Sequence, residues 1–565
     1  MKPISIQQPR YQALIGLGVA LIVILLTIHV PQGVGFDPSI QVLSVDQYLK
    51  NISPSPNHYL AADQNDLSRD QLHWIHNWPP GTQLFVLPLM SMGLDIGTSL
   101  RILSVACVLL GAMGWALWFG KFNIPGIVGL MLSCYVPCLR FTNNYIFSYN
   151  NAEILVFALA PWLLLGSWHV TRPGMVHHRI FLSCILGFGC GMAYVFKFSG
   201  AFIAGPALGF LWLTAMGRWF SHQQDNLFKI SILGTLTCLL PILVWSFLNL
   251  HYGGYVNQFD ALYSPGKLNW SVLVRLFTYP ALCLGDADAL WNYLLLHPDH
   301  GIFHPSRQII QGIDGSFVVN LIGIPGGILF LMLLARPGAW QGPGKLGILS
   351  IFLGMLGLLI VWANTHIGYL STYLQVTTFA VFPVLIREGV HIWQSPREKR
   401  WWRMTLAMGG AFYLLIPMGY GLVSMAGKIV RIQPDYKVAS SGLFNPFLSS
   451  TTRSPVDVVA ELTQKFNPKT DIWFTPNVNI RLDLPGRALM VSDWIDVNDW
   501  RKIRFHTSQP LRVLALIPKA TETGPSGKGP AIRDAFVDAQ TWEHVPLATI
   551  PLDLWIGQLD KTLAQ

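Results

Sequence analysis

The amino-acid sequence predicts an all-α polytopic membrane protein with a small α/β domain at its C-terminus. Three observations lead to this prediction. The 565 residues are 52% hydrophobic and only 12% charged, which is about half the charge of a soluble protein. The apolar residues gather in runs long enough to cross a hydrocarbon core as helices. Beyond residue 430 the charged residues return, and short β-forming runs occur.

The apolar runs give about eleven candidate transmembrane helices. A helix rises about 1.5 Å per residue, so a run of roughly 20 residues is long enough to cross the membrane. In chain order the candidates are Tyr11–Val30, Ser99–Phe119, Ile124–Phe141, Ala152–Val170, Ile180–Phe196, Gly200–Trp219, Ile230–Leu250, Phe317–Ala335, Leu346–Ala363, His366–Ile386 and Met404–Ser424. Together they predict a multi-pass membrane domain over residues 1–429.

The connections between these helices differ in charge, and this difference predicts their orientation. Lysine and arginine collect in alternate connections and are densest at 387–403, REGVHIWQSPREKRWWR. Because cationic loops stay in the cytoplasm, we expect the N-terminus inside and the C-terminal domain outside. These loops also explain the net charge of +9, so no nucleic acid is expected as a partner. The expected location is the bacterial inner or plasma membrane.

Acidic residues of the membrane domain gather on the opposite side. Only Asp225, Glu388 and Glu398 are expected inside, whereas the other carboxylates before residue 424 fall in outer connections or at outer helix ends. Two outer connections, 31–98 and 251–316, are long, and long ordered loops are usually functional. We therefore expect the chemistry at the outer face.

The polar C-terminal part, residues 430–565, predicts a small extracytoplasmic α/β domain. Runs of β-forming residues occur at Asp471–Thr475, Ala488–Val491 and Arg512–Ile517. A Ser-Pro pair opens a helical pattern at Ser454–Phe466, as is common at the N-terminus of a helix.

The first long outer loop contains the most informative carboxylate. Asp37 follows the first apolar run within GFDPSIQ, and the loop ends with HWIHNWPPGTQ. A carboxylate at the membrane boundary suits a general base that acts on a hydroxyl while the other substrate stays in lipid. Asp-Pro-Ser is also a good start for a helix, so the alternative is that Asp37 opens a turn or caps a helix.

Four further ionisable residues are expected at outer helix ends or in the outer loops. A cation at membrane depth is costly without an anionic partner, and a lipid-linked phosphate would be such a partner for Lys197, Arg140 or Arg307. For Lys197 the alternatives are a structural pair with an acid such as Glu153, or a side chain that extends to the interface. Glu153 itself either binds acceptor hydroxyls or stabilises its helix N-terminus through the helix dipole.

The second long outer loop carries three closely spaced histidines, His297, His300 and His304. Pro298 and Pro305 favour an irregular backbone there, so we expect exposed loop histidines and no metal site. The sequence requires no cofactor, although it leaves open whether a divalent cation takes part. It contains no glycine-rich loop for a nucleotide and no G-x-S-x-G nucleophile elbow.

The order of these features resembles the GT-C superfamily of polytopic glycosyltransferases, in particular the protein mannosyltransferases and aminoarabinose transferases. Members carry an acidic residue after the first span and a W/R-P-P-G segment at the end of the first outer loop, here Asp37 and Trp78–Gly81. Their fourth span often opens with an acidic residue, here Glu153. A later helix break holds a basic residue, an aromatic, a small residue and glycine, here Lys197–Gly200. The motifs lie in the first part of the chain, and the rest matches in outline.

The resemblance implies a GT-C-like fold and a membrane glycosyltransferase of the cell envelope, active in polysaccharide biosynthesis. Such an enzyme moves a hexose or pentose from a polyprenyl-phosphate carrier to a lipid, glycan or protein acceptor on the outer face, with inversion at the anomeric carbon. The resemblance further implies that Asp37 deprotonates the acceptor. It also implies that Lys197, with Arg140 or Arg307, holds the carrier phosphate.

The sequence departs from the group at one point, because many members have two acidic residues close together in the first outer loop. Asp37 is followed by Pro and Ser, so Asp46 and Asp70 are the candidates for a second acidic group, and Glu153 for acceptor binding. A lipid-linked sugar flippase or transporter and a non-catalytic membrane assembly protein are the competing functions. A transporter usually has charged or broken helices near the bilayer centre and repeat symmetry.

Overall fold

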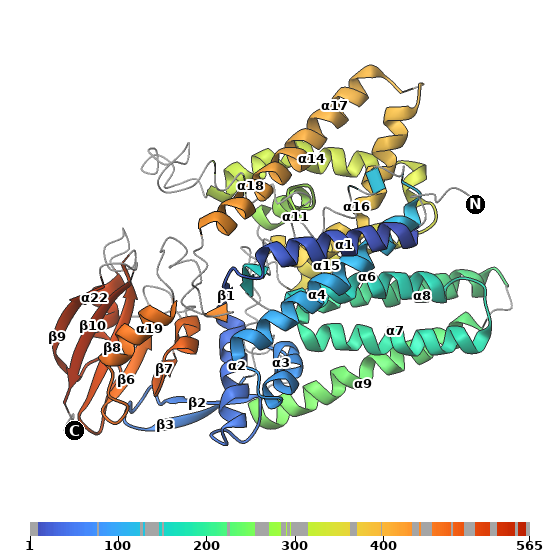
Figure 1. Cartoon of the computed structure of the whole chain (residues 1–565). Coiled ribbons are helices and arrows are strands. Elements are labelled where there is room, and N and C mark those ends of the chain that lie inside the picture. The colour runs from blue at the N-terminus through green and yellow to red at the C-terminus, as the bar shows by residue number, and fades with distance from the viewer. Residues whose placement is uncertain are drawn as a thin grey trace. The chain divides into compact units, whose positions relative to one another are not determined.

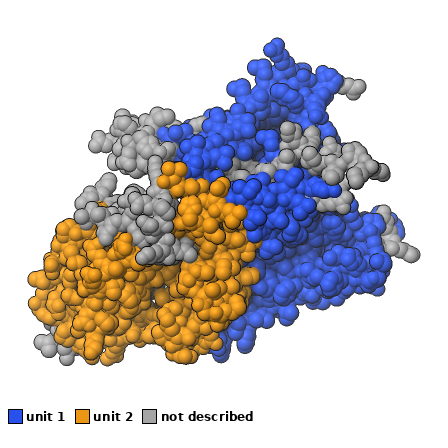
Figure 2. Space-filling view, viewed as in Figure 1, with its two compact units in different colours: residues 1–23, 107–142, 153–427 blue, residues 24–106, 143–152, 428–565 orange. Residues whose placement is uncertain are grey.

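The chain folds into two compact units, which Figure 2 shows in different colours. The computed structural model describes residues 9–75, 78–124, 128–129, 131, 146–149, 152–222, 226–254, 270–283, 290, 294, 315–361, 370–396, 398–431, 440–441, 455–475, 478–490, 503–519, 528–547 and 552–560. The helical unit comprises residues 1–23, 107–142 and 153–427, and the mixed unit comprises residues 24–106, 143–152 and 428–565.

The helical unit is built almost entirely of apolar helices (Figure 1). Helices α1 (Pro9–Thr27) and α4 (Ile96–Phe119) contribute residues to both units. The remaining helices of the helical unit are α6 (Glu153–Val170), α7 (Val176–Phe196), α8 (Ala201–Phe220), α9 (Leu227–Gly253), α11 (Trp270–Leu282), α14 (Gly315–Leu334), α15 (Gly344–Val361), α16 (Leu370–Gln394), α17 (Arg400–Gly410) and most of α18 (Ile416–Arg431). A helix lies at every predicted span except Ile124–Phe141, most of which is outside the described residues.

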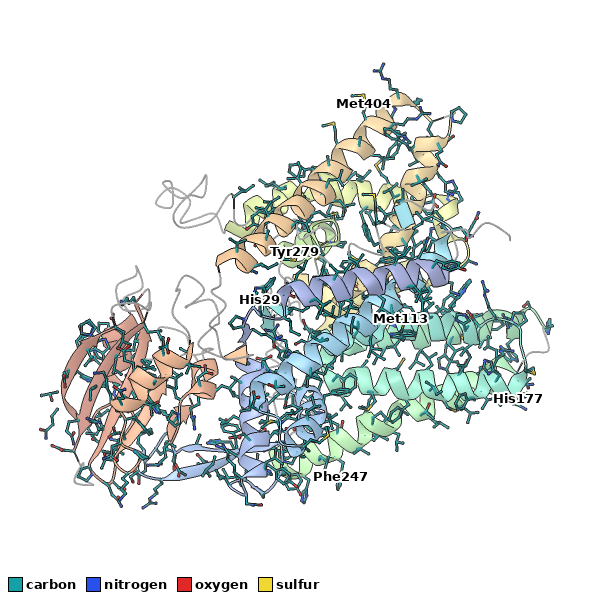
Figure 3. The ribbon with its side chains drawn as sticks, viewed as in Figure 1. His29, Met113, His177, Phe247, Tyr279 and Met404 are labelled. Carbon is teal, nitrogen blue, oxygen red and sulfur yellow. The ribbon has the colours of Figure 1, made fainter. Side chains whose placement is uncertain are left out.

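The protein is an integral membrane protein. Within the described ranges, six helices are long and apolar enough to cross a membrane: Ile96–Phe122, Glu153–Val170, Val176–Phe196, Phe198–Phe220, Leu227–Gly253 and Arg400–Val430. Helix α9 shows the lipid-facing surface clearly, because Leu236, Leu240, Leu243, Phe247 and Leu250 recur at helical spacing and are each 51–67% exposed. Phe247 is labelled on this helix in Figure 3. Such a set of large exposed apolar side chains is stable in hydrocarbon and costly in water. The predicted number of about eleven spans stays a prediction.

Helix α11 was not predicted, since it falls within the loop expected at residues 251–316. The structure describes it over the 13 residues Trp270–Leu282. It packs against α14 and α16. Its Arg275 interrupts the apolar residues, which explains why a search for long apolar runs does not find it.

Helices α7 and α9 pack at glycines. A Cβ atom added to Gly187 would lie 1.9 Å from the carbonyl oxygen of Gly234, and one added to Gly191 would lie 2.3 Å from that of Cys238. Small residues at such positions let two helix backbones approach closely inside a membrane. This pair of glycines therefore fixes how the two helices meet.

The C-terminal part of the mixed unit is a five-stranded sheet with the order β7-β6-β8-β10-β9. Its strands are β6 (Asp471–Thr475), β7 (Ala488–Met490), β8 (Leu511–Pro518), β9 (Ala539–Pro546) and β10 (Leu552–Leu559). Strands β7, β6 and β8 are parallel, whereas β10 is antiparallel to β8 and β9. The predicted strands at 471–475, 488–491 and 512–517 and the predicted helix at 454–466, now α19 (Pro455–Gln464), are confirmed.

Side chains of β8 alternate between the two faces of this sheet, as the pleat of a strand requires. Val513 and Ala515 join one hydrophobic core with Ile532 of α22 (Lys528–Asp534). Leu514 and Leu516 join a second core with Val458 and Leu462 of α19. The sheet is therefore covered by a helix on each face.

The first long loop contributes a hairpin to the same fold. Strands β2 (His58–Ala62) and β3 (Asp70–Trp74) pair antiparallel, and Ala62 and Leu67 are buried in the core that contains β8. The backbone N–H of Leu67 donates to the carbonyl of His506 at 2.8 Å. The loop after the first span and the C-terminal region thus form one folded unit.

Candidate functional site

A three-stranded parallel sheet in the mixed unit joins three segments that are far apart in the sequence. Its order is β4-β1-β5, with β4 at Ser148–Tyr149, β1 at Gln32–Val34 and β5 at Ser440–Ser441. Two further backbone bonds extend the pairing of β1 with the β4 segment, Gly33 N–H to Phe147 O and Gly35 N–H to Tyr149 O, both 2.8 Å. The sheet therefore fixes the chain up to Gly35, which immediately precedes Phe36 and Asp37.

Helix α4 holds two of these segments through one buried arginine. Arg101 is only 6% exposed, and its guanidinium donates to the carbonyl of Ile146 at 3.0 Å and to the carbonyl of Val30. One turn further along α4, Ser104 Oγ accepts a hydrogen bond of 2.7 Å from Gln32 Nε2. Because Val30 and Ile146 precede β1 and β4, Arg101 fixes the start of both strands.

Asp37 lies in the first turn of helix α2 (Phe36–Leu49). Gly35 is the N-cap residue of this helix, and no side chain caps it. Asp37 is therefore not the N-cap residue, although a carboxylate in the first turn is favoured by the helix dipole. Asp37 is partly exposed, and it stands on a regular helix.

Buried polar side chains fasten α2 to the Trp-Pro-Pro-Gly segment and to helix α3 (Gly81–Ser91). Gln41 Nε2 donates to the carbonyl of Pro79 at 2.7 Å. Gln83 Nε2 donates to Asn57 Oδ1 at 2.8 Å and lies 3.3 Å from Ser44 Oγ. Because buried polar groups are costly unless they are hydrogen-bonded, these contacts select one position of α2.

Tyr149 connects the same segment to strand β4. It is fully buried, and its hydroxyl lies 3.2 Å from Thr82 Oγ1 in α3. Trp78 packs against a small cluster formed by Ile40 of α2 and Ile75. The two motifs at the ends of the first loop, Asp37 and Trp78–Gly81, are thus held in one folded region.

Asp46 does not lie beside Asp37. It follows nine residues later on α2, which corresponds to two and a half turns, so it faces the opposite side about 13 Å further along the axis. Its carboxylate forms an i,i+4 pair with Lys50 at 2.8 Å. Burial lowers the pKa of Arg481 to about 10, and the negative charge of nearby Asp46 opposes that shift.

Asp70 and its neighbour Asp66 attach the hairpin to the C-terminal sheet. Arg487 donates to Asp70 Oδ1 from Nε at 3.0 Å and from Nη2 at 2.8 Å. Asp66 accepts hydrogen bonds from Ser508, at 2.9 Å from its N–H and 2.7 Å from its hydroxyl, and from Ser68. Burial alone raises the pKa of Asp66, but these hydrogen bonds lower it well below its ordinary value.

Glu153 and Lys197 lie in the helical unit. Glu153 is the first residue of α6 and is 4% exposed. Lys197 is half-buried in the break between α7 and the short 3₁₀ turn η3 (Phe198–Gly200), where its backbone is extended. The break requires Gly200, since a Cβ atom there would lie 2.0 Å from the carbonyl oxygen of Ala193. The predicted helix break at Lys197–Gly200 is confirmed.

Other predicted site residues fall outside the described residues. These are Arg140, Arg307 and the histidines at 297, 300 and 304. Within the part of the chain that the structure describes, no three His, Cys, Asp or Glu side chains are grouped so that they could hold a metal ion.

Two residues that position this region, Arg101 and Tyr149, were not singled out from the sequence. Arg101 did leave a signal, because it is a cation near the start of the apolar run Ser99–Phe119, and such residues are rare in transmembrane helices without a partner. Tyr149 left none, since an aromatic residue beside a span is common in any membrane protein.

Solved structures similar to this chain include two of ArnT from Cupriavidus metallidurans. The structure bound to undecaprenyl phosphate is 12% identical, covers 98% of each chain and has a TM-score of 0.49. The apo structure is 12% identical, covers 96% of this chain and 97% of ArnT, and has a TM-score of 0.47. ArnT is an aminoarabinose transferase of the GT-C group. No protein-family model matches the chain, and no curated protein matches it.

Proposed function

We propose that the protein is a membrane glycosyltransferase that moves a sugar from a polyprenyl-phosphate carrier to an acceptor hydroxyl at the outer face. The observation that carries this proposal is the position of Asp37. An accessible carboxylate follows directly after strand β1, which is hydrogen-bonded to the segment before Glu153 and to the C-terminal region. The motif order of the sequence, from Asp37 through Trp78–Gly81 and Glu153 to Lys197–Gly200, supports the same activity.

In the proposed reaction Asp37 accepts the proton of the acceptor hydroxyl. The hydroxyl oxygen forms a bond to the anomeric carbon from the face opposite the phosphate, and the bond from that carbon to the phosphate oxygen breaks. The electron pair of the broken bond leaves with the polyprenyl phosphate, and the proton passes from Asp37 to water. A positioned general base of this kind contributes about 10²- to 10⁴-fold to the rate.

Lys197 is proposed to hold the carrier phosphate, together with Arg140 or Arg307. Negative charge grows on the phosphate as the glycosyl bond breaks, so a fixed cation stabilises the transition state more than the bound donor. The extended backbone at Lys197 and the tight turn at Gly200 give this side chain one defined point of origin. A lysine here acts as a point charge toward a phosphate group.

The other acidic residues receive different proposed roles. Glu153, buried at the start of α6, is proposed to bind acceptor hydroxyls. Asp46 and Asp70 are proposed to be structural, because they form ion pairs with Lys50 and Arg487. Asp37 then acts without a second carboxylate from its own loop.

The test uses cells that lack the protein and express either wild-type protein or the Asp37→Asn variant at equal levels. Envelope glycolipids and glycans are compared by mass spectrometry. The proposal expects a sugar-bearing product with the wild type and its loss with Asp37→Asn, while Asp63→Asn in the same loop keeps it. Asp63 is the matched control, since its carboxylate accepts a turn hydrogen bond from Asn65 N–H and has no proposed role in sugar transfer. An unchanged product with Asp37→Asn contradicts the proposed role and favours a transporter or an assembly protein.

A further inference from the structure

A cavity of about 320 Å³ lies within the helical unit between α14, α16 and α17. Its walls are almost entirely apolar and include Leu329 and Leu333 of α14, Leu385 and Trp393 of α16, and Leu406 of α17. The volume is at the lower end of the range of about 300–1,000 Å³ that is typical of ligand pockets. Among the described residues proposed for sugar transfer, which are Asp37, Glu153 and Lys197, none lines it.

A bridging hydroxyl lies where α14 is interrupted at one side of the cavity. Pro325 lies inside α14, and a proline removes a hydrogen bond from a helix and strains the preceding turn. The hydroxyl of Tyr413 accepts from Gly326 N–H at 3.0 Å and donates to Ile322 O at 2.5 Å, bridging the two groups that an α-helix would join directly. Tyr413 belongs to the π-helical turn Ala411–Leu415. Its ring therefore stands between the backbones of the two helices.

Glycines leave the cavity open on its other sides. Gly389 of α16 and Gly410 of α17 both line it, and a Cβ atom added to either one would meet no atom within 4 Å. Among the described residues that line the cavity, only Tyr413 has a hydroxyl, and this hydroxyl already donates and accepts hydrogen bonds within the protein. The part of a ligand that enters must therefore be apolar.

A cationic group lies close to the rim of the cavity. Arg403 precedes the lining residue Leu406 by one helical turn, and its Nη2 donates at 2.5 Å to the carbonyl of Ser395, two residues beyond Trp393. Its Nε is buried and has no hydrogen-bond partner among the described residues. A buried guanidinium N–H without an acceptor is costly, so an anion that accepted from Arg403 beside the apolar cavity would be stabilised.

The surrounding charge has the same sign. Lys399 and Arg400 start α17, whereas the acids of this end are engaged elsewhere: Glu398 lies 2.9 Å from Arg336, and Glu388 lies 3.5 Å from Arg336 and 3.3 Å from Arg387. Trp393 and Trp401 are 59% and 51% exposed, as tryptophans are at the level of lipid headgroups. Figure 3 shows Met404 on the same helix, α17.

We propose that this cavity binds one acyl chain of an anionic phospholipid and that Arg403 binds the phosphate of that lipid. The chain fills the apolar space beside Tyr413, and the headgroup meets the surplus of cations at the junction of α16 and α17. This junction is the connection that the sequence predicts to face the cytoplasm, where anionic lipids give the membrane surface its negative potential. The site is separate from the proposed sugar transfer.

The test uses the full-length protein in phosphatidylcholine vesicles that contain a small fraction of phosphatidylglycerol with a photoreactive diazirine in its acyl chain. Labelled peptides are identified by mass spectrometry. The proposal expects labelling at Trp393 or Leu406. It expects about a tenfold loss of labelling with Gly389→Leu. The leucine side chain would occupy the cavity, and an acyl chain that still entered would overpack it. Gly419→Leu is the control, since Gly419 also has open space but does not line the cavity.

A second pair of measurements tests the headgroup. Arg403→Gln is expected to lower labelling by phosphatidylglycerol about tenfold, as the loss of a charged hydrogen bond does, and to leave the weak labelling by a diazirine phosphatidylcholine unchanged. Should Gly389→Leu fail to fold, Gly410→Val blocks the same space. Equal labelling by the two lipids in the wild type overturns the proposal. So does displacement of the probe by polyprenyl phosphate and not by phosphatidylglycerol, which would assign the cavity to the carrier. The labelling is also repeated with the Asp37→Asn protein. It is expected to be unchanged, because lipid binding in the cavity does not depend on sugar transfer.

Discussion

At the scale of single residues, the position of Asp37 depends on side chains that have no proposed contact with a substrate. Asp37 stands in the first turn of α2, and the chain before it is fixed by β1 and by the guanidinium of Arg101. A general base must lie within hydrogen-bond distance of the proton that it accepts. A shift of about 1 Å in such a group can lower the rate about 100-fold.

Arg101→Lys tests this positioning. A lysine ammonium cannot reproduce the planar, two-sided contact with Val30 O and Ile146 O, so sugar transfer is expected to fall about tenfold. The affinity for the donor is expected to stay the same, because Arg101 is not proposed to bind it. Transfer rate and donor affinity are measured separately on purified protein. A parallel loss of donor affinity and of protein level would instead assign Arg101 a general role in folding.

For Lys197 the expected change is in donor affinity, whereas for Arg101 it is in the transfer rate. Lys197→Gln removes the positive charge in the break between α7 and η3, and the affinity for a polyprenyl phosphate is expected to fall about tenfold or more, as a lost charged hydrogen bond implies. Lys197→Arg keeps the charge and is expected to recover part of the affinity. Native mass spectrometry with undecaprenyl phosphate measures both. Wild-type affinity in the glutamine variant would remove Lys197 from the phosphate site.

At the scale of elements, two kinds of packing hold the structure together. In the helical unit, helices α7 and α9 approach at glycines. In the mixed unit, the β2–β3 hairpin is held to the C-terminal sheet by carboxylates and by two buried apolar residues. The glycine contact between α7 and α9 is sensitive to added side-chain volume. The carboxylate contacts of the hairpin are sensitive to pH.

Gly187→Ala tests the glycine contact. The new methyl group would lie 1.9 Å from the carbonyl oxygen of Gly234, so the helices must separate, and the free energy of unfolding is expected to fall by about 1–3 kcal/mol. Gly205→Ala in α8 is the matched control, because a Cβ atom there meets nothing within 4 Å and alanine favours a helix. Thermal unfolding in one detergent compares the two. Equal melting temperatures would show that α7 and α9 do not meet at this glycine.

Asp66→Asn tests the attachment of the hairpin and its pH dependence. Hydrogen bonds from Ser508 and Ser68 hold the pKa of Asp66 below its ordinary value despite burial. The folded state therefore gains stability from the ionised carboxylate above the unfolded pKa of about 3.9, and loses it as the pH falls toward the lower folded pKa. Hydrogen exchange of the hairpin amides is expected to be faster in the variant at neutral pH, and the difference should shrink below about pH 4. A difference that does not change with pH would contradict the ionised form.

At the scale of the whole molecule, sequence analysis could predict what apolar runs and charge encode. Leu-, Ile- and Val-rich runs of the right length predicted the helices, and the β-forming runs near Trp473 and Leu514 predicted the C-terminal strands. The end of one apolar run at Phe196 and the start of the next at Gly200 predicted the helix break at Lys197–Gly200, and the resemblance to the GT-C group implied the same break. These features are encoded within a few neighbouring residues.

Long-range contacts could not be predicted in this way. Strands β1, β4 and β5 are two or three residues long, which is too short for an alternating pattern to show. They also join positions more than 100 residues apart in the sequence. The pairing of Asp70 with Arg487 has the same character, and so has the shared core of Leu67 with β8. The sequence predicted a catalytic role for Asp37, but not which side chains hold the chain before it in place.

The most direct test of the central claim measures donor consumption by purified protein. Wild-type protein and the Asp37→Asn variant are incubated with polyprenyl-phosphate-linked sugars and an extract of envelope acceptors, and free polyprenyl phosphate is quantified by liquid chromatography and mass spectrometry. Wild-type protein should release the carrier phosphate, and Asp37→Asn should release it about 10²- to 10⁴-fold more slowly. Release at the wild-type rate by the variant, with an equal amount of folded protein, would contradict the claim that Asp37 is the catalytic base.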